Sequence, residues 1–213
     1  MREEDIWEPV DQKVKKLRLM EKVPNSVYSR LIIRYPYQRD DDYAMFYFDS
    51  AERLASTFKG DTVDDQILIP FLLLYRHGFE LLLKASIREL IRLRSVYLGH
   101  DDPDISDKAL NERLEKVHGH KLYPLLNEVK QHWKLLDPGE EFPKDVEQLI
   151  SMLHEMDRSG LAFRYSGSLP DYQDYVDFPD LAALLEDGKV KLYSAMDYIT
   201  EGYAAMPTLS ELM

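Results

Sequence analysis

Residues 66–88, QILIPFLLLYRHGFELLLKASIR, constrain the fold more than any other stretch, because charged side chains interrupt a run that is otherwise apolar and helix-forming. At about 100° per residue, Arg76, Glu80, Lys84 and His77 fall within one stripe of a helix. The opposite arc, about 200° wide, is mostly apolar, which is wider than the apolar face of an ordinary surface helix. We therefore expect a helix from about residue 64 to residue 97 at the centre of a helical bundle.

The polar stripe on this helix has two interpretations. In the structural one, Arg76, Glu80 and Lys84 form a ladder of alternating charge at the bundle surface, and each pair contributes a few tenths of a kcal/mol. In the functional one, the stripe lines a cleft in which His77 or Lys84 contacts a ligand, since charges on a nearly buried helix often mark sites. In both interpretations the charged side chains are expected to be less buried than their apolar neighbours.

The rest of the chain is typical of an all-α protein, because helix-forming segments alternate with Pro- and Gly-containing breaks and strand-like alternation is nearly absent. Ser106 is a suitable N-cap, Pro124 fits a first helical turn, and Gly60 and Gly160 are stop signals. Further helices are expected at 41–59, 107–117, 121–136, 144–160 and from about 179 to 204; residues 11–22 are helix-compatible, and 161–180 form a loop or hairpin. The predicted fold is an antiparallel helical bundle of about five to six helices over residues 41–213, after an irregular N-terminal arm over residues 1–40.

The composition narrows the environment of the protein. The chain of 213 residues has no cysteine, which excludes disulfides and cysteine-based zinc sites and is typical of a reducing compartment. No apolar stretch of signal-peptide length follows Met1, and charges interrupt the apolar run before the roughly 20 residues that a membrane crossing needs. The net charge of −12 disfavours encounter with anionic polymers. We expect a cytoplasmic protein with no membrane contact, in which nucleic acid would need a local basic patch.

Three segments resemble a known family when they are taken together. RHGFELLLKASIREL (76–90), GHKLYPLLNEV (119–129) and DRSGLAFRY (157–165) follow one another in the order and separation seen in the HEPN superfamily of bacterial helical-bundle proteins. The resemblance spans roughly residues 41–204. It implies an antiparallel bundle, often a homodimer, that works as a nucleotide- or RNA-associated accessory protein, often of a toxin or phage-defence system.

The same resemblance implies a nuclease as an alternative. Nuclease members of the family carry an arginine and, a few residues later, a histidine, and two copies of this pair meet at a dimer interface. RLEKVHGH offers Arg113 with His118 or with His120, although Leu114 follows the arginine where those members usually have a polar residue. The chemistry is suitable, because histidine acts as a general acid or base near neutral pH and arginine stabilises charge on a phosphate. The alternative function is therefore a metal-independent RNase.

A second group of residues points to ligand binding. If the GHKL segment packs against the central helix, His120 can pair with Glu80, and Arg164 can join Asp157 in a polar cluster. Together with Arg76, His77 and Lys84, such a cluster would suit a phosphate-bearing small molecule or a nucleotide. It would equally suit a buried network that fixes the register of the helices.

Other chemistries lack their required parts in this sequence. There is no Gly-rich phosphate loop, no GxSxG elbow and no HExxH motif, and HEMD (154–157) is typical of a solvated helix surface rather than a metal site. We therefore expect no metal and no cofactor. A third possibility is a non-catalytic interaction protein, in which the acidic surface and the aromatic segment 25–48 bind a protein partner.

Overall fold

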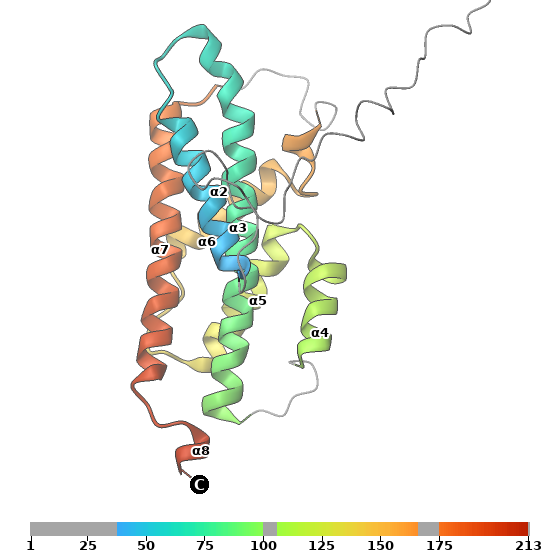
Figure 1. The fold of residues 1–213 in the computed structure, drawn as a ribbon, viewed down its shortest axis with the longest axis vertical. Helices are drawn as coiled ribbons and strands as arrows, with labels where there is room; N and C mark the ends of the chain where they lie inside the picture. Colours follow the sequence, from blue (N-terminus) through green and yellow to red (C-terminus); the bar gives the residue numbers. More distant parts are fainter. Residues whose placement is uncertain (1–37, 100–105, 166–174, 213) are drawn as a thin grey trace, which may run out of the picture. The chain divides into compact units, whose positions relative to one another are not determined.

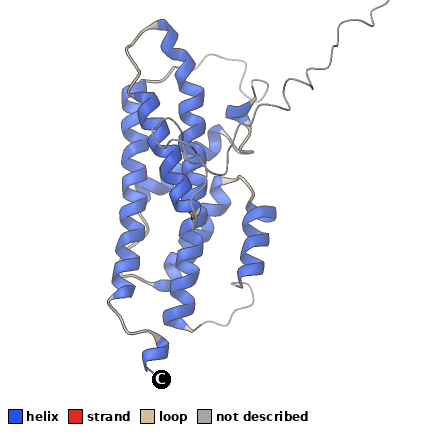
Figure 2. Cartoon of the chain, viewed as in Figure 1, coloured by secondary structure: helices blue, strands red, loops and turns tan. Residues whose placement is uncertain are grey.

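The computed structural model of the chain describes residues 38–99, 106–165 and 175–212. These residues form an all-α helical bundle, as predicted, and none of them belongs to a β-strand (Figure 1, Figure 2). The α-helices are α2 (Asp40–Ala55), α3 (Asp65–Leu93), α4 (Asp107–Glu112), α5 (Leu122–Leu136), α6 (Lys144–Met156), α7 (Phe178–Ala204) and α8 (Leu209–Leu212).

Helix α3 is the centre of the bundle, which confirms the prediction from its wide apolar arc. Phe71, Phe79, Leu83 and Ile87 are all inaccessible to solvent and belong to one core with side chains of α2, α5, α6 and α7. The helix continues as a π-helical turn over Arg94–Leu98 and stops at a left-handed glycine after it. A central helix of this length positions every other element of the bundle.

Contacts along α3 set the direction of its neighbours. Helix α2 is antiparallel to α3, because Asp40 at its start pairs with Arg88 and Phe48 further along packs on Phe79. Helix α6 is antiparallel to both α5 and α7, whereas α5 and α7 run in the same direction as α3. The short α4 segment returns the chain between α3 and α5 and makes that parallel arrangement possible (Figure 1).

Two glycines allow helices to approach closely. A Cβ atom on Gly78 of α3 would lie 2.6 Å from the Phe48 ring of α2, and one on Gly188 of α7 would collide with Leu149 of α6. Neither glycine breaks its helix, since each lies inside a regular stretch. Their role is to remove the side chain where a large apolar residue of the next helix must fit.

Several helix ends differ from the prediction. Helix α2 stops at Ala55 rather than at residue 59, because the carboxylate of Asp64 accepts hydrogen bonds from the backbone N–H groups of Lys59, Gly60 and Asp61 and fixes a turn there. Helix α6 stops at Met156, and α8 was not predicted. The N-cap at Ser106 and the first-turn position of Pro124 are confirmed.

Other predictions concern residues outside the described part. The helix-compatible segment 11–22, most of the arm over 1–40 and the centre of the predicted loop or hairpin over 161–180 fall there. Among the described residues, the helix Thr62–Leu98 is long and apolar enough to span a membrane by length and composition alone, and half of its most apolar window is buried inside the bundle. The central helix of a water-soluble bundle passes the same test.

Candidate functional site

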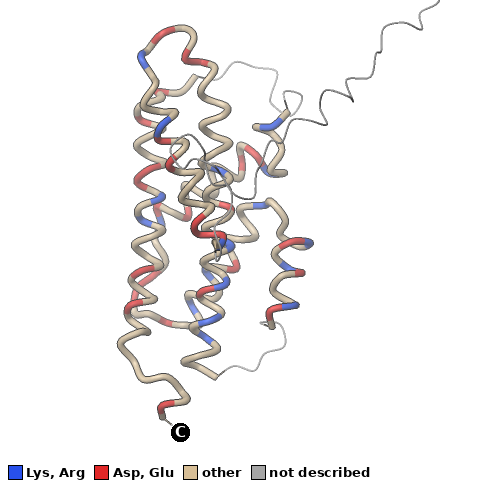
Figure 3. Tube along the Cα trace, viewed as in Figure 1, with Lys and Arg blue, Asp and Glu red and all other residues tan. Residues whose placement is uncertain are grey.

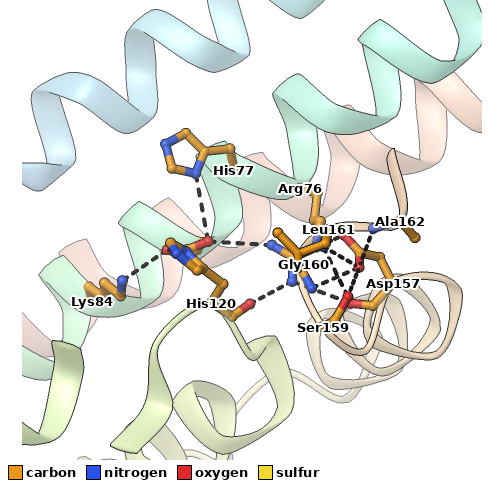
Figure 4. Close-up of polar contacts among 10 residues, drawn as sticks. Arg76, His77, Lys84, His120, Asp157, Ser159, Gly160, Leu161 and Ala162 are labelled. Atoms are coloured by element: carbon orange, nitrogen blue, oxygen red, sulfur yellow. Dashed lines mark hydrogen bonds and ion pairs between the residues drawn. The ribbon is translucent and has the colours of Figure 1, made fainter. Parts of the chain in front are cut away.

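The predicted ladder of Arg76, Glu80 and Lys84 is present, but the expectation that it lies at the bundle surface was wrong, because its first two residues are buried. Arg76 and Glu80 each expose 1% of their surface. They lie one helical turn apart, with Nη1 of Arg76 3.3 Å from Oε2 of Glu80. The stripe is covered because two connecting segments, residues 119–121 before α5 and residues 157–162 after α6, fold over it (Figure 4).

Arg76 holds both covering segments. Its Nε lies 2.8 Å from Oδ2 of Asp157, and its Nη2 donates to the backbone carbonyls of His120 at 2.5 Å and of Asp157 at 3.3 Å. A guanidinium has five donors in a rigid fork, so one side chain can bind two loops and a neighbouring carboxylate at once. Arg76 therefore connects α3 to the residues just before α5 and to those just after α6.

Asp157 organises the second of these segments. Its Oδ1 accepts hydrogen bonds from the backbone N–H groups of Gly160, Leu161 and Ala162 at 2.7, 2.9 and 3.0 Å, while Oδ2 faces Arg76 (Figure 4). The turn requires a left-handed residue, and Gly160 supplies it with φ +81°. One buried carboxylate thus satisfies a run of backbone donors that would otherwise be buried without partners.

Three basic side chains surround the carboxylate of Glu80 on the side of the cluster nearer to solvent. Its Oε1 accepts hydrogen bonds from Lys84 Nζ at 2.8 Å and from His120 Nδ1 at 2.9 Å, and His77 Nδ1 lies 3.6 Å from Oε2. The predicted pairing of His120 with Glu80 is therefore present. His120 is half exposed at the side chain, and the His77 ring makes an edge contact with Tyr47 of α2.

Electrostatics keep Glu80 ionised in this setting. Burial on its own raises the pKa of Glu80, but the nearby nitrogens of His77, Lys84 and His120 outweigh it and hold that pKa well below its usual range. Burial lowers the pKa of Arg76, and the carboxylates of Asp157 and Glu80 oppose that effect. Arg76 and Lys84 balance Glu80 and Asp157, so each charged group inside the cluster has an opposite partner.

This arrangement can do two things chemically. It fixes the register of three chain segments, since Arg76 links them and its removal would leave the buried Asp157 without a cation. It also gathers Lys84, His77 and His120 around a single carboxylate, each from a different direction (Figure 4), which places three basic side chains close together beside the solvent. We call this outer set of three basic side chains the Glu80 edge.

Arg164 does not complete the cluster as expected. Its side chain is exposed on the short helical turn Ala162–Arg164, and within the described residues it forms no ion pair with Asp157. Asp157 pairs with Arg76 instead. Arg164 is nevertheless close enough for its charge to oppose that of Arg76, so it adds positive potential beside the Glu80 edge.

The nuclease candidates separate into two clusters. Arg113 and His118 both bind Glu128 of α5: Arg113 donates through Nη2 at 2.7 Å and through Nε at 2.9 Å, and His118 donates through Nε2. His120 belongs to Glu80, on the other cluster. The structure therefore brings together the pair Arg113 and His118, and it does not join Arg113 with His120.

The Glu128 cluster contains three residues that sequence reasoning missed, namely Glu128 itself, Arg94 and His132. Arg94 is buried and donates from Nη1 to His132 Nδ1 at 2.8 Å, and His132 Nε2 lies 3.4 Å from Glu128 Oε1. Because arginine can only donate, Nδ1 of His132 is the acceptor and Nε2 carries the proton that faces Glu128. Arg94, His132, Glu128, Arg113 and His118 thus form a continuous polar chain across α3, α5 and the α4 segment.

A signal for part of this second cluster is visible in the sequence. Glu128 and His132 are four residues apart on a helix whose apolar residues are buried, so they lie on one face and contact each other. Arg94 carries no such signal, because it ends a helix where exposed arginines are common. Only the packing of α5 against the end of α3 buries it.

Neither cluster has the form of a ready ligand pocket or metal site. Three cavities among the described residues lie elsewhere, and none of these three is lined by Arg76, Glu80 or Glu128. The described residues also contain no group of three His, Asp or Glu side chains arranged to hold a metal ion. Any ligand of these clusters must approach from their exposed edges.

Comparisons with known proteins add no assignment. No family model, no curated protein and no solved structure matches the chain.

Proposed function

We propose that this chain is a HEPN-like accessory protein of a toxin or phage-defence type system, which works as a cytoplasmic homodimer and binds a nucleotide or an RNA end at the Glu80 edge. The Glu80 edge consists of Lys84, His77 and His120 around the buried Glu80 carboxylate. The proposal concerns binding of a phosphate group rather than cleavage of a phosphodiester bond.

One observation carries this proposal. The segments 76–90, 119–129 and 157–165, chosen from the sequence for their resemblance to HEPN proteins, meet around a single guanidinium, that of Arg76. They are separated by tens of residues in the chain, so nothing about their local sequence requires them to touch. Their contact supports the interpretation that the three segments form one site. A chance resemblance of three separate leucine-rich segments would not require them to meet.

The chemistry of the edge favours a phosphate. Lys84 uses one of its three N–H donors on Glu80, and His120 binds Glu80 through Nδ1, which leaves two N–H donors of Lys84 and, when the ring is protonated, Nε2 of His120 for a ligand. Arg76 does not contact the ligand in this scheme, because it is buried. It acts as a positioning residue that holds His120 and the 157–162 turn beside α3.

The charge distribution limits the size of the ligand. Basic and acidic residues are interspersed along the traces of the described helices (Figure 3). A long polyanion would meet repulsion from the overall charge of −12, whereas a single phosphate group needs only a local site. A mononucleotide or the end of a short RNA therefore suits this surface better than a double helix.

Equilibrium binding to matched variants tests the proposal. We would measure the affinity of purified protein for fluorescent mononucleotides and for a short single-stranded RNA, comparing Lys84→Gln and His120→Gln with Lys191→Gln. Lys191 is the control, because it is also paired with carboxylates but lies on α7, away from the edge. Loss of one phosphate contact lowers affinity by about tenfold or less and reduces the salt dependence by about one ion.

The two outcomes are distinct. Weaker binding in Lys84→Gln and His120→Gln, with Lys191→Gln unchanged, supports the Glu80 edge as the site. Equal affinity in all four proteins, or no binding of either ligand by the wild type, would overturn the proposal. Thermal unfolding of each variant separates loss of a contact from loss of the fold.

A second candidate function is a metal-independent RNase, and the shared carboxylate of Glu128 favours it. Glu128 orients His118 and holds Arg113 beside it. In such a reaction His118 would accept the proton of a ribose 2′-hydroxyl as that oxygen attacks the neighbouring phosphorus. The P–O5′ bond would break, the departing 5′-oxygen would take a proton from water, and Arg113 would stabilise the charge on the phosphate.

Cleavage assays distinguish this candidate from the first. The RNase predicts metal-independent cleavage of RNA that falls by at least about a hundredfold in His118→Gln and in Arg113→Lys. His120→Gln should retain full cleavage, since His120 binds the other carboxylate. Cleavage that survives both substitutions, or that depends on His120 instead, would exclude the pair Arg113 and His118.

A further inference from the structure

One cavity among the described residues is a groove unrelated to either polar cluster. It has a volume of about 670 Å³ and lies between the start of α2, the second half of α3 and the second half of α7. Leu82 and Ala85 of α3 and Met196 of α7 supply its apolar surface. A cavity of this size lies within the range of small-molecule sites, which are typically apolar with a few fixed polar groups.

The arginines at this groove are already neutralised. Arg39 pairs with Asp41 at 3.2 Å, and Arg92 pairs with Glu89 through two hydrogen bonds of 2.6 and 2.9 Å. The third arginine of the lining, on α3, is paired in the same way with a carboxylate at the start of α2. These cations are therefore poor candidates to attract an anionic ligand, because each would first have to release a carboxylate.

Two polar groups of α7 remain without partners in the groove. Asp197 lines it and has no cationic partner within the described residues. The hydroxyl of Tyr193, one helical turn earlier, is buried and makes no hydrogen bond. Burial, together with the nearby carboxylates of Asp41 and Asp197 among others, raises the pKa of Tyr193 to about 12, so the phenol stays protonated in a negative field.

We propose that this groove binds a primary aliphatic amine, such as a linear polyamine, with its ammonium group between Tyr193 and Asp197 and its alkyl chain along Leu82, Ala85 and Met196. The ammonium donates to the phenolic oxygen and to the carboxylate, which satisfies both unpartnered groups at once. The apolar surface of the groove then covers the methylene groups. An anion of the same shape would meet the uncompensated carboxylate instead.

Ligands of equal length and different charge test the proposal directly. We would titrate the full-length protein with hexylamine, hexanol and hexanoate, and follow the backbone amide signals of α3 and α7 by NMR. The proposal predicts that hexylamine binds more tightly than hexanol and that hexanoate binds most weakly. Spermidine should perturb the same signals, since it carries the same primary ammonium on an alkyl chain.

Variants separate this site from the general attraction of an acidic protein for amines. Asp197→Asn and Tyr193→Phe should each lower the affinity for hexylamine by about three- to tenfold, while the affinity for hexanol stays nearly unchanged. Asp187→Asn is the control, because Asp187 is, like Asp197, an exposed residue of α7 but does not line the groove and is paired with Lys191. It should have no effect on hexylamine beyond the error of the measurement.

Each other result overturns the proposal. If hexanoate binds as tightly as hexylamine, the arginines control the groove and the assignment of an amine is wrong. If Asp187→Asn weakens hexylamine as much as Asp197→Asn does, binding is diffuse attraction to negative charge. If none of the ligands perturbs residues around Tyr193, the groove is not an amine site. The amide spectrum of each variant also reports whether its fold is retained.

Discussion

Arg76 and Asp157 are 81 positions apart in the sequence, yet Nε of the arginine lies 2.8 Å from Oδ2 of the aspartate inside the bundle. The pair connects the central helix to the turn after α6, and both residues expose only 1% of their surface. Burial of two charges is tolerated when each is paired and hydrogen-bonded, as here. The stability of the bundle should therefore depend on this pair far more than on surface ion pairs.

Substitution of Arg76 tests that dependence. Arg76→Met should lower the free energy of unfolding by about 3–5 kcal/mol, because it leaves the carboxylate of Asp157 buried without its cation and leaves Glu80 with Lys84 alone. The control is Arg158→Met, whose ion pair with Glu155 is exposed and should contribute no more than about 1 kcal/mol. Urea denaturation of both variants gives the comparison. Similar small losses would show that Arg76 is not the organising residue.

Gly160 is a second point at which the cluster can be tested. It has φ +81°, and a Cβ atom there would lie 2.6 Å from Cβ of His120. Gly139 has nearly the same conformation, φ +85°, but open space around it. Gly139→Ala should cost only the backbone strain, about 1–2 kcal/mol. Gly160→Ala should cost about 1–3 kcal/mol more, because it also separates the two covering segments.

Measured side by side, these two alanine variants separate conformation from packing. Equal losses of unfolding free energy would mean that the contact between Gly160 and His120 carries no stability.

Two helical glycines should respond to alanine with opposite signs. Gly78→Ala should destabilise the protein by about 1–3 kcal/mol, since its Cβ would enter the ring of Phe48 and push α2 from α3. Gly202 lies in α7 with open space around it, so Gly202→Ala should stabilise by up to about 1 kcal/mol through helix propensity. Thermal unfolding temperatures report both. A stabilising effect of Gly78→Ala would contradict the close approach of α2 and α3.

Acid should unfold the protein through its two buried glutamates. Burial alone raises the pKa of Glu128, but His132, Arg113 and His118 outweigh it and hold that pKa below its usual range, as the neighbours of Glu80 do for Glu80. A carboxyl whose folded pKa is depressed contributes stability above its unfolded pKa, about 4.5 for glutamate, and loses it as the pH falls toward the folded value. Stability should therefore decrease steadily below that pH.

Glutamine variants check the source of this pH dependence. Glu80→Gln and Glu128→Gln should each be less stable at neutral pH, and each should show a shallower decrease of the unfolding free energy in acid, by roughly a kcal/mol or more over the acid range. Unfolding by urea at several pH values between neutrality and acid provides the data. A slope equal to that of the wild type in both variants would assign the acid sensitivity to other groups.

The helices could be predicted from the sequence because their signals are local. The apolar arc of α3, the N-cap at Ser106 and the first-turn position of Pro124 depend on residues a few positions apart, and the structure confirms each. The end of α2 was placed too late, because the carboxylate of Asp64 fixes the preceding turn. That contact involves hydrogen bonds which hydrophobic periodicity does not reveal.

The candidate site was predicted only in part, for a physical reason. Pairing of His120 with Glu80 followed from the idea that the GHKL segment packs on α3, and it is present. The burial of Arg76 could not be inferred, because the segments that cover it come from distant parts of the chain. The partner of Asp157 was expected to be Arg164, since that residue is near in sequence, but the partner is Arg76.

The most direct test of the account is to locate a bound phosphate on the protein. We would titrate isotopically labelled protein with inorganic phosphate and with a mononucleotide, and follow the histidine side-chain and lysine ammonium signals by NMR. The account predicts that His120, His77 and Lys84, which surround the Glu80 carboxylate, shift together at the lowest ligand concentrations. If these signals stay unchanged while those of His118 and His132 shift, or if no signal shifts, the Glu80 edge is not the binding site.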